Sequence, residues 1–325
     1  MIAWKPEQMS MRDAFGEKLL EIARADPRVY VLDGDLANST KVNLVAEQLP
    51  GKFLQMGIAE QNMMGVAAGM AAGGLQPWAA TFAAFLTKRS LDQIVVTIAQ
   101  TRLDVKMIGA YSGLLNGRAG KTHQAIEDVA IMRSIPYMTV IAPGDNEELR
   151  QAMEFARHYR GPVYIRVARD PVLPIYREGM KFVPGKALIL KEGRDISIIT
   201  SGTQAGRALQ AALELEKEGV SAEVLHVPTI KPLDVEAIVA SARRTGAVVT
   251  AEEHSVIGGL GGAVAETLGE HYPVPVMRLG IEDQNIQSGS DNDLLERYGL
   301  SVEHVKRMAK KCLDKKIKDK ESTGQ

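Results

Sequence analysis

A carboxylate, a pair of aromatic rings and a histidine lie in short segments of this sequence that could carry chemistry. Glu60 stands at the head of the stretch 59–74, which has helical periodicity and in which Gly65, Gly69 and Gly73 recur every four residues. A carboxylate at a helix start is stabilised by the helix dipole, so a purely structural role for Glu60 stays open. Each glycine inside a helix costs ~1 kcal/mol relative to alanine. Close approach of another backbone along this stripe would offset that cost.

A second candidate segment delivers His123 from the glycine-containing loop 117–122 to the expected start of a helix. An imidazole can donate, accept or transfer a proton near neutral pH, although a structural role is the alternative for a single histidine in a loop. Phe82 and Phe85 lie three residues apart and could equally belong to a core helix or strand. The glycine-rich run 258–262 lacks the full dinucleotide fingerprint, which makes it a weak candidate for cofactor binding.

Short β-branched runs alternate with longer helical segments along most of the chain. Strands are expected at 29–32, 105–109, 138–141, 163–167, 196–200, 222–227, 247–251 and 275–279. Helices are expected at 10–25, 59–74, 89–102, 123–134, 145–159, 203–218, 234–244 and 261–271. Strands that are separated by helices imply crossover connections, so the fold class is α/β with a mainly parallel sheet.

Two domains are expected from the length of 325 residues, at roughly 150 residues per domain. The segment 171–194 is rich in proline and glycine, which indicates a connector. We therefore expect a first domain over 1–190, which includes most of the connector, and a second α/β domain over 191–312. The lysine-rich tail, 313–325, is expected to be disordered.

The composition is that of an ordinary globular protein, with 45% hydrophobic and 24% charged residues. The net charge of −1 argues against a surface that coats nucleic acid or a polybasic membrane anchor. A single cysteine, Cys312, excludes an intramolecular disulfide and a cysteine-rich metal site. No apolar run approaches the roughly 18 residues of a membrane span, and the first residues lack a signal peptide's features. We expect a cytoplasmic protein that binds neither nucleic acid nor membranes.

Four motifs, in this order and spacing, resemble the C-terminal half of a transketolase. They are GIAEQNMMGVAAGMA, TFAAF, THQAIEDVAIMRSIPYMTVIAP and EEHSVIGGLGGAVAE. The similarity is greatest to the second subunit of the bacterial transketolases that are encoded as two chains, and it covers about 9–312. It implies a pyrimidine-binding domain followed by a smaller C-terminal α/β domain, with thiamine diphosphate as the cofactor.

The resemblance also implies which residues hold the cofactor. Glu60 matches the carboxyl that hydrogen-bonds N1′ of the aminopyrimidine and so promotes the imino form that removes the thiazolium proton. Such a carboxyl needs a sheltered site. Phe82 and Phe85 match the family's aromatic wall, Ile58 would line the same ring, and Asp35 matches a family acid near the cofactor. The cofactor carries out the chemistry, and the protein orients it.

Substrate contacts follow from the same resemblance. His123 would contact the terminal hydroxyl and the carbonyl oxygen of a ketose. Arg12, Ser39 and Arg169 match the ligands of the substrate phosphate, and arginine is well suited to bidentate phosphate recognition. Tyr111 stands where common transketolases have a histidine that contacts substrate. The implied reaction is the transfer of a two-carbon ketol unit from a ketose phosphate to an aldose phosphate.

The Gly-Asp-Gly motif with its later asparagine, which holds the diphosphate and its metal in the family, is absent, because Asp33-Gly34-Asp35 does not fit it. This chain is therefore expected to bind only the pyrimidine half of the cofactor. A separate N-terminal subunit would hold the diphosphate and Mg²⁺ (or Ca²⁺ or Mn²⁺), most simply in an α2β2 heterotetramer. The chain itself is expected to bind no metal, and to be active only with its partner.

The substrate loop departs from the family pattern. Besides Tyr111, the pair Arg118-Ala119 replaces a Glu-Asp pair whose aspartate reads the configuration of a donor hydroxyl. Loss of such a group can change discrimination by orders of magnitude. The donor could therefore be a branched ketose phosphate such as apulose 4-phosphate, or a sulfosugar, given the positive charges of Arg118 and Lys121.

Three alternatives stay open at this point. The chain could be a housekeeping transketolase subunit with a drifted loop. It could be the β subunit of a 2-oxo acid dehydrogenase E1 component, although that enzyme needs no sugar-phosphate ligands such as Arg12, Ser39 and Arg169. It could also be a non-catalytic regulatory or binding subunit, although Glu60 and His123 are retained.

Overall fold

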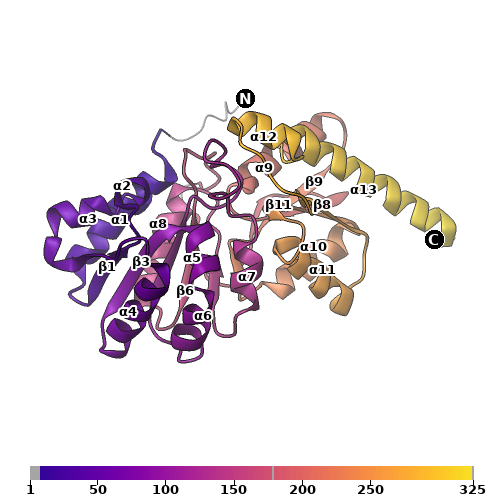
Figure 1. The fold of residues 1–325 in the computed structure, drawn as a ribbon. Coiled ribbons are helices and arrows are strands. Elements are labelled where there is room, and N and C mark those ends of the chain that lie inside the picture. The colour runs from indigo at the N-terminus through magenta and orange to yellow at the C-terminus, as the bar shows by residue number, and fades with distance from the viewer. Residues whose placement is uncertain (1–7, 178, 324–325) are drawn as a thin grey trace.

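The structure, a computed structural model, describes residues 8–177 and 179–323. It contains two α/β units that lie side by side, each built on its own sheet (Figure 1). The mainly parallel α/β fold expected from the sequence is confirmed. Within the described residues, no helix combines the length and the apolar character that a membrane crossing requires.

The first sheet has seven strands in the order β10-β5-β6-β4-β3-β1-β2. Its strands are β1 (Val29–Asp33), β2 (Phe53–Gln55), β3 (Gln76–Phe82), β4 (Lys106–Ala110), β5 (Thr139–Ile141), β6 (Val163–Val167) and β10 (Thr229–Lys231). Every neighbouring pair is parallel except β10, which pairs antiparallel with β5. Because side chains alternate along a strand, β3 sends Trp78 and Ala80 into one hydrophobic core and Ala79 into another.

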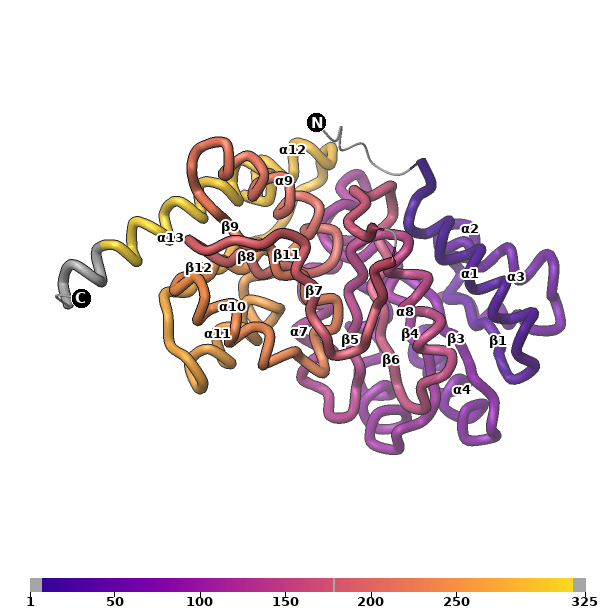
Figure 2. The backbone as a smooth tube through the Cα atoms, turned by 180° about the vertical axis from the view of Figure 1, so that it is seen from behind, coloured from indigo at the N-terminus to yellow at the C-terminus, as the bar shows by residue number. Residues whose placement is uncertain are grey.

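Helices cover both faces of this sheet, with α1 and α8 packed together on the face that Figure 2 shows in front. The helical elements are α1 (Met11–Ala25), α2 (Ala37–Thr40), α3 (Asn43–Gln48), the 3₁₀ turn η1 (Pro50–Lys52), α4 (Glu60–Ala72), α5 (Ala83–Arg89), α6 (Leu91–Gln93), the π-helical turn η2 (Ile94–Ala99), α7 (Asp128–Ser134) and α8 (Asn146–His158). Helix α1 begins where Ser10 accepts a hydrogen bond from the backbone N–H of Asp13, and it buries Phe15, Leu19 and Ile22 on one face.

The second sheet has five strands in the order β12-β11-β8-β9-β7, with only β7 antiparallel to its neighbour. Its strands are β7 (Leu188–Lys191), β8 (Ile196–Thr200), β9 (Ala222–His226), β11 (Val248–Ser255) and β12 (Val276–Ile281). Its helices are α9 (Gln204–Lys217), α10 (Val235–Thr245), α11 (Leu260–His271), α12 (Asp291–Arg297) and α13 (Val302–Thr323).

The two units are joined by buried contacts. Strand β10 comes from the second half of the sequence yet forms the edge of the first sheet. Nε2 of His226, on β9, donates to the carboxylate of Glu148, on α8, at 2.7 Å, and both side chains are fully buried. The hydroxyl of Tyr176, in the connector, donates to the same carboxylate at 2.8 Å. The boundary expected near 190 is therefore crossed by both backbone and side-chain interactions.

Most expected helices and strands are confirmed, and three expectations are wrong. The helix expected at 123–134 begins only at Asp128, because the backbone of Ala125 forms a β-bridge with Gly113 instead. The single helix expected at 89–102 is broken into the end of α5, α6 and η2. The break falls at Ser90, whose hydroxyl bonds back to the carbonyl oxygen of Leu86.

The expected disorder of the tail is the third difference. Helix α13 continues to Thr323, so most of the segment 313–325 is helical, and its last two residues lie outside the described part of the chain. Cys312 is buried against the second sheet, and the ammonium group of Lys316 donates to the carbonyl oxygens of Asp195 and Thr245. These contacts hold the middle of the helix, and the turns beyond it continue the same hydrogen-bonded ladder.

Candidate active site

The residues singled out in the sequence meet at the carboxyl ends of adjacent parallel strands. Phe82, the last residue of β3, lies opposite Ala110 at the end of β4, and Ala110 lies opposite Val167 at the end of β6. The residues that follow these strand ends, Tyr111 and Arg169, therefore reach the same edge of the sheet. Ligands of α/β proteins bind at this edge, because loops and helix N-termini converge there.

Glu60 is the first residue of α4, and its side chain is only 3% exposed. Its Oε1 accepts a hydrogen bond from Nη1 of Arg89 at 2.6 Å. Helix α4 starts after the short turn that follows β2, so the positive end of the helix dipole lies beside this carboxylate. Ile58, two residues earlier, is 74% exposed, which is unusual for a large apolar side chain. A hollow in the surface here is lined by Ile58, Ala59, Glu60, Gln61, Asn62 and Arg89.

Four rings form a continuous group next to this hollow. Phe82 stacks on Tyr111, with ring centroids 4.1 Å apart and planes 24° apart, and lies 5.6 Å from Phe85. His123 presents its edge to both phenylalanines, at 5.9 Å and 5.2 Å. The guanidinium of Arg89 lies over the ring of Phe85 at 3.9 Å. Arg89 therefore connects Glu60 to the aromatic group, and the group leads on to Tyr111.

Two arginines from distant parts of the sequence meet at Tyr111. Nη1 of Arg12 donates to the Tyr111 hydroxyl at 2.5 Å, and the two residues are 99 positions apart in the chain. The guanidinium of Arg169 lies 5.8 Å from the centroid of the same ring, and Nη1 of Arg169 is 3.1 Å from Oδ2 of Asp170. Arg12 also approaches the carbonyl oxygen of Ser39, on α2, at 3.5 Å. Two of the three expected phosphate ligands, Arg12 and Arg169, are thus neighbours of one phenol, and the third, Ser39, lies next to Arg12.

The two acids of the Asp33-Gly34-Asp35 segment differ in burial: Asp33 is buried, whereas Asp35, the acid expected near the cofactor, is exposed. Asp33 is fully buried and accepts from the backbone N–H of Leu36 and from Nε2 of Gln55. Burial raises the pKa of Asp33 above its usual value. Asp35 is exposed at the end of β1 and has a left-handed backbone with φ of 65°. Its carboxylate therefore faces the outside of this chain at the same edge of the sheet.

His123 lies in an irregular loop rather than at a helix start. The loop runs from Tyr111 to the beginning of α7, and Nδ1 of His123 is 2.8 Å from the hydroxyl of Thr122. The second domain holds this loop: Oε1 of Glu253, on β11, accepts from the backbone N–H groups of Leu114 and Leu115 at 2.9 and 3.2 Å. The position of His123 therefore depends on both domains.

Three of the side chains that organise this site were not identified from the sequence. Arg89 pairs with Glu60 over 29 positions, Glu253 holds the His123 loop over 139 positions, and Asp170 pairs with Arg169. Only Asp170 carried a signal, because it directly follows an expected phosphate ligand. The partners of Arg89 and Glu253 are set by long-range packing, for which a single sequence contains no local pattern.

The glycine-rich run at 258–262 is excluded as a phosphate-binding loop. The carboxylate of Glu252 already accepts the backbone N–H groups of Leu260 and Gly261, both at 2.7 Å. These are the amide groups at the start of α11 that a dinucleotide phosphate would need. The loop is therefore a capping arrangement within the second domain.

The described residues contain no group of three or more His, Cys, Asp or Glu side chains that could hold a metal ion. The side chains around Glu60 are not those of a metal site. A sheltered carboxyl, an exposed apolar side chain and adjacent aromatic rings fit one end of a planar heteroaromatic group with a ring nitrogen. The aminopyrimidine of thiamine diphosphate is such a group, so these residues fit the pyrimidine end of that cofactor.

Comparison with known protein families gives two matches that together span nearly the whole chain. Residues 7–172 match the family described as transketolase, pyrimidine binding domain. Residues 185–305 match the family described as transketolase, C-terminal domain. The boundary between the two matches falls within the connector.

Among individual relatives, the chain is 45% identical over 312 residues to a 6-deoxy-6-sulfo-D-fructose transketolase subunit of Clostridium sp. (strain MSTE9), covering 96% of this chain and 97% of the relative. It is 38% identical over 302 residues to one subunit of an apulose-4-phosphate transketolase of Phocaeicola vulgatus, covering 93% and 96%. Among solved structures, a split-gene transketolase described as an inactive β4 tetramer superimposes with a TM-score of 0.85. It is 44% identical, over 95% of this chain and 99% of that one.

Proposed function

The chain belongs to the transketolase family, as a subunit that acts with a partner chain, and we propose that the pair uses a ketose donor with a terminal oxyanion. The reaction is the transfer of a two-carbon ketol unit to an aldose phosphate. The observation that carries this proposal is the continuous series of contacts from Glu60 through Arg89 and the aromatic rings to Arg12 and Arg169. It supports one site with a cofactor end and an anion end.

Thiamine diphosphate, when bound, would supply a carbon nucleophile for the donor carbonyl. Glu60 would hold the pyrimidine nitrogen and share a proton with it, and its burial keeps that proton from exchanging freely with water. Ile58 and Phe85 would cover the ring. Arg89 is the group that the ring would replace at Glu60, because its guanidinium bonds the carboxylate and covers Phe85 in this structure.

His123 would act at the donor's oxygen atoms. Its ring lies beside Phe82 and Phe85, between the proposed cofactor end and Tyr111. An imidazole at this point can donate to the carbonyl oxygen and accept from a hydroxyl of the same sugar. Arg12, Ser39 and Arg169 would then bind the far end of the donor, where the terminal oxyanion lies.

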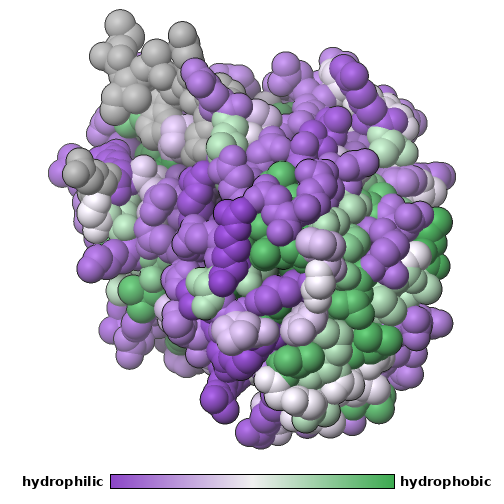
Figure 3. Space-filling model, turned by 90° about the vertical axis from the view of Figure 1, so that its left-hand side faces the viewer, coloured by the Kyte–Doolittle hydropathy of each residue, from purple (hydrophilic) through white to green (hydrophobic). Residues whose placement is uncertain are grey.

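The partner subunit would dock on the face that carries α4. A Cβ built on Gly65 or Gly69 would meet nothing within 4 Å, so the glycine stripe is open to a close approach from outside this chain. An apolar area spreads over the side of the molecule shown in Figure 3. Ile58 and Val96 are large apolar side chains of the first domain that are left exposed. The partner would supply the diphosphate ligands and Mg²⁺, in an α2β2 heterotetramer.

The related split-gene transketolase is described as inactive in a β4 assembly. We expect the present chain, alone, to be inactive in the same way, because the described residues provide no metal site. It would act in the cytoplasm on sugar phosphates and their analogues.

The donor would differ from an ordinary pentose phosphate. Tyr111 and Ala119 stand where common transketolases carry a histidine and an aspartate that contact the donor. Two relatives are named for unusual donors, 6-deoxy-6-sulfo-D-fructose and apulose 4-phosphate. Arg118 and Lys121 are exposed on the His123 loop, where they add positive charge. Both named donors end in an oxyanion, which agrees with the pair of arginines.

The test is turnover by the complex purified from cells that express both subunits, supplied with thiamine diphosphate and Mg²⁺. We expect two-carbon transfer from apulose 4-phosphate or 6-deoxy-6-sulfo-D-fructose at rates above those with xylulose 5-phosphate. Preference for xylulose 5-phosphate would make this an ordinary transketolase with a changed loop. Decarboxylation of 2-oxo acids without turnover of any ketose would overturn the assignment of the reaction itself.

A further inference from the structure

The anion end of the site is built around one phenol. Tyr111 adopts a left-handed backbone conformation, with φ of 55°, which is uncommon for a residue that is not glycine. Stacking on Phe82 and burial to 6% exposure hold the ring in place. The phenolic oxygen accepts from Arg12, so the phenolic proton remains available to an oxygen atom of a ligand.

Arg169 approaches the same phenol from the segment that follows β6. Its guanidinium is 5.8 Å from the ring centroid. Burial lowers the pKa of Arg169, but the charge of Asp170 and a hydrogen bond to Tyr111 outweigh it, so the net shift of this pKa is upward. Two guanidinium groups repel each other, so a shared neutral partner lowers the cost of holding both at one point. Nε of Arg12 is buried and has no hydrogen-bond partner among the described residues, which leaves a donor for a ligand.

The net charge of the side chains around Tyr111 is smaller than the two arginines alone would give. Arg12 and Arg169 contribute two positive charges, and Asp170, 3.1 Å from Arg169, contributes one negative charge, so the sum is +1. Asp13 and Lys41 form a neutral pair next to Arg12. Asp291 lies close to Asp170, and burial together with the charges of Asp170 and Glu253 raises the pKa of Asp291.

A phosphate ester carries close to two negative charges at pH 7, because its second pKa is about 6. A sulfonate has the same tetrahedral arrangement of three oxygen atoms but carries a single negative charge. A site with a net charge of +2 favours the dianion, whereas a site with a net charge of +1 favours it less. With Asp170 present, the site around Tyr111 therefore suits a monoanion better than a site with Arg12 and Arg169 alone would.

From this we infer that Tyr111 binds the donor's terminal oxyanion and that Asp170 is a specificity-determining residue, which makes a ketose with a terminal sulfonate an effective donor. The inference rests on the proposed function, since it concerns the donor of that reaction. In the reaction the C2–C3 bond of the sulfoketose breaks and C2 bonds to the aldehyde carbon of the acceptor. The C3 hydroxyl loses its proton as C3 becomes an aldehyde, and the acceptor's oxygen gains one. The sulfonate stays on the released aldose, and no oxidant is needed.

The experiment compares two donors that differ only in the terminal group, 6-deoxy-6-sulfo-D-fructose and D-fructose 6-phosphate, with one aldose phosphate acceptor. The complex with the partner subunit is used, with kcat and KM measured for each donor. For the wild-type complex we expect kcat/KM for the sulfonate to equal or exceed that for the phosphate. Asp170→Asn raises the site charge by one, so the ratio of phosphate to sulfonate kcat/KM should rise about three- to tenfold.

Tyr111→Phe removes the hydroxyl and keeps the ring that stacks on Phe82. It should raise KM for both donors about tenfold while kcat changes less than about threefold, because the hydroxyl acts on the anion and not on the reacting carbon atoms. Asp314→Asn, an exposed aspartate on α13, is the control and should leave the ratio unchanged. An unchanged ratio in Asp170→Asn, or turnover of the phosphate donor without the sulfonate donor, would overturn the inference and leave the transketolase reaction standing. Turnover of neither donor, nor of any other ketose, would instead count against the proposed function.

Discussion

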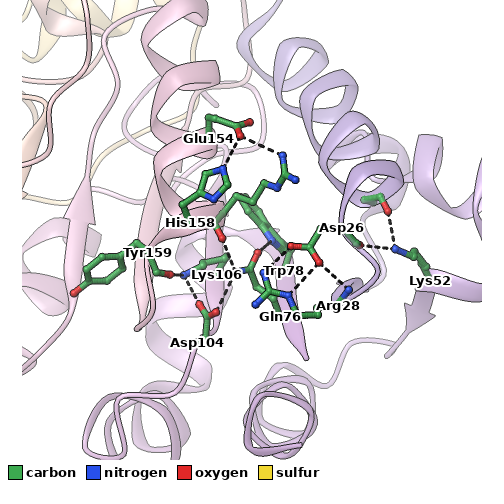
Figure 4. A network of polar contacts seen from close by, with 12 residues as sticks. Asp26, Arg28, Lys52, Gln76, Trp78, Asp104, Lys106, Glu154, His158 and Tyr159 are labelled. Carbon is green, nitrogen blue, oxygen red and sulfur yellow. Dashed lines mark hydrogen bonds and ion pairs between the residues drawn. The ribbon is translucent and has the colours of Figure 1, made fainter. Parts of the chain in front are cut away.

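The two ends of the seven-stranded sheet differ in how completely their charged groups are paired. At the amino end, Lys106 starts β4 with its side chain fully buried, and its ammonium group donates to the carbonyl oxygens of Tyr159 and Gly161 at 2.7 and 3.0 Å. It also lies 2.5 Å from the carboxylate of Asp104. Burial lowers the pKa of Lys106 to about 8. Figure 4 shows this network, in which Gln76 also donates to Asp104.

The carboxyl end of the same sheet is arranged differently. Arg12 has a buried Nε with no hydrogen-bond partner among the described residues, and its Nη1 donates to two uncharged groups, the Tyr111 hydroxyl and the carbonyl oxygen of Ser39. The Glu60 carboxylate is buried but pairs with Arg89, whose side chain is 45% exposed and can leave. Ile58 is left largely exposed. Polar groups that lack partners within a chain are costly to its stability unless a ligand or another chain satisfies them.

The comparison separates two uses of buried charge in one domain. The amino end pairs its charges within the chain and so stabilises the start of these strands. The carboxyl end leaves donors and apolar surface for molecules that are not part of this chain. Substitutions at the first end should therefore change stability with little effect on turnover, and substitutions at the second should do the reverse.

The largest effect is expected from Glu60→Gln. An amide of the same shape cannot share a proton with a ring nitrogen as a carboxyl does, so kcat of the complex should fall about 10²- to 10⁴-fold. The thermal unfolding midpoint should move by less than about 3 °C, because only one exposed ion-pair partner is lost. Arg89→Gln, which breaks the same pair but keeps the carboxyl, is the control, and we expect less than a tenfold loss. Equal losses in the two variants would assign the effect to the ion pair.

Lys106→Met should have the largest effect on stability. It leaves two carbonyl oxygens and the carboxylate of Asp104 without their buried donor, so the free energy of unfolding should fall by about 3 kcal/mol. Urea denaturation of the isolated subunit measures this, and kcat of the complex at 25 °C should be unchanged. Lys52→Met, at a half-buried lysine that donates to the carbonyl oxygens of Ala23 and Asp26, should cost about 1 kcal/mol. A loss of turnover in Lys106→Met would contradict the proposal that the amino end of the sheet serves stability alone.

Glu253→Gln tests whether the second domain positions the site. The variant replaces the charged acceptor of the Leu114 and Leu115 amides with a neutral amide oxygen, and it removes the 2.7 Å ion pair with Arg207. The loop that carries His123 should then be less well placed, and kcat/KM should fall about tenfold. Glu252→Gln is the matched control, since this neighbouring carboxylate caps α11 and does not touch the loop. It should lower stability without this loss of activity, and equal losses would show a general effect on the domain.

The smallest effect is expected from Asp26, on the amino end. Its hydrogen bond to Arg28 lowers the pKa of Asp26 from 3.8 to about 2. The native state therefore binds this proton more weakly than the unfolded state, so the stabilisation is complete above about pH 4 and is lost as the pH falls through 2. Because Arg28 is half-exposed, its size should be at most about 1 kcal/mol. The difference in unfolding free energy between the wild type and Asp26→Asn should be smaller at pH 3 than at pH 6, and a difference that grows on acidification would contradict the assignment.

The sequence by itself determined the α/β rhythm of the chain and the set of residues worth testing. Hydrophobic periodicity and helix caps are local, so the strands and helices at 29–32, 163–167 and 203–218 could be predicted within a few residues. The motif around Glu60 could be recognised for the same reason, because its residues are consecutive. The start of α7 could not, since the bridge that keeps Ala125 out of a helix is made with Gly113, twelve residues earlier.

Only the tertiary structure decided which charges meet. Strand order brings the ends of β3, β4 and β6 together, and with them Arg12, Tyr111 and Arg169, which no local pattern connects. The same packing gives Glu60 an arginine partner and makes the position of the His123 loop depend on Glu253 in the other domain. Local preferences act over a few residues of chain, whereas pairing of charges depends on distances in space that are fixed only when the sheets have formed.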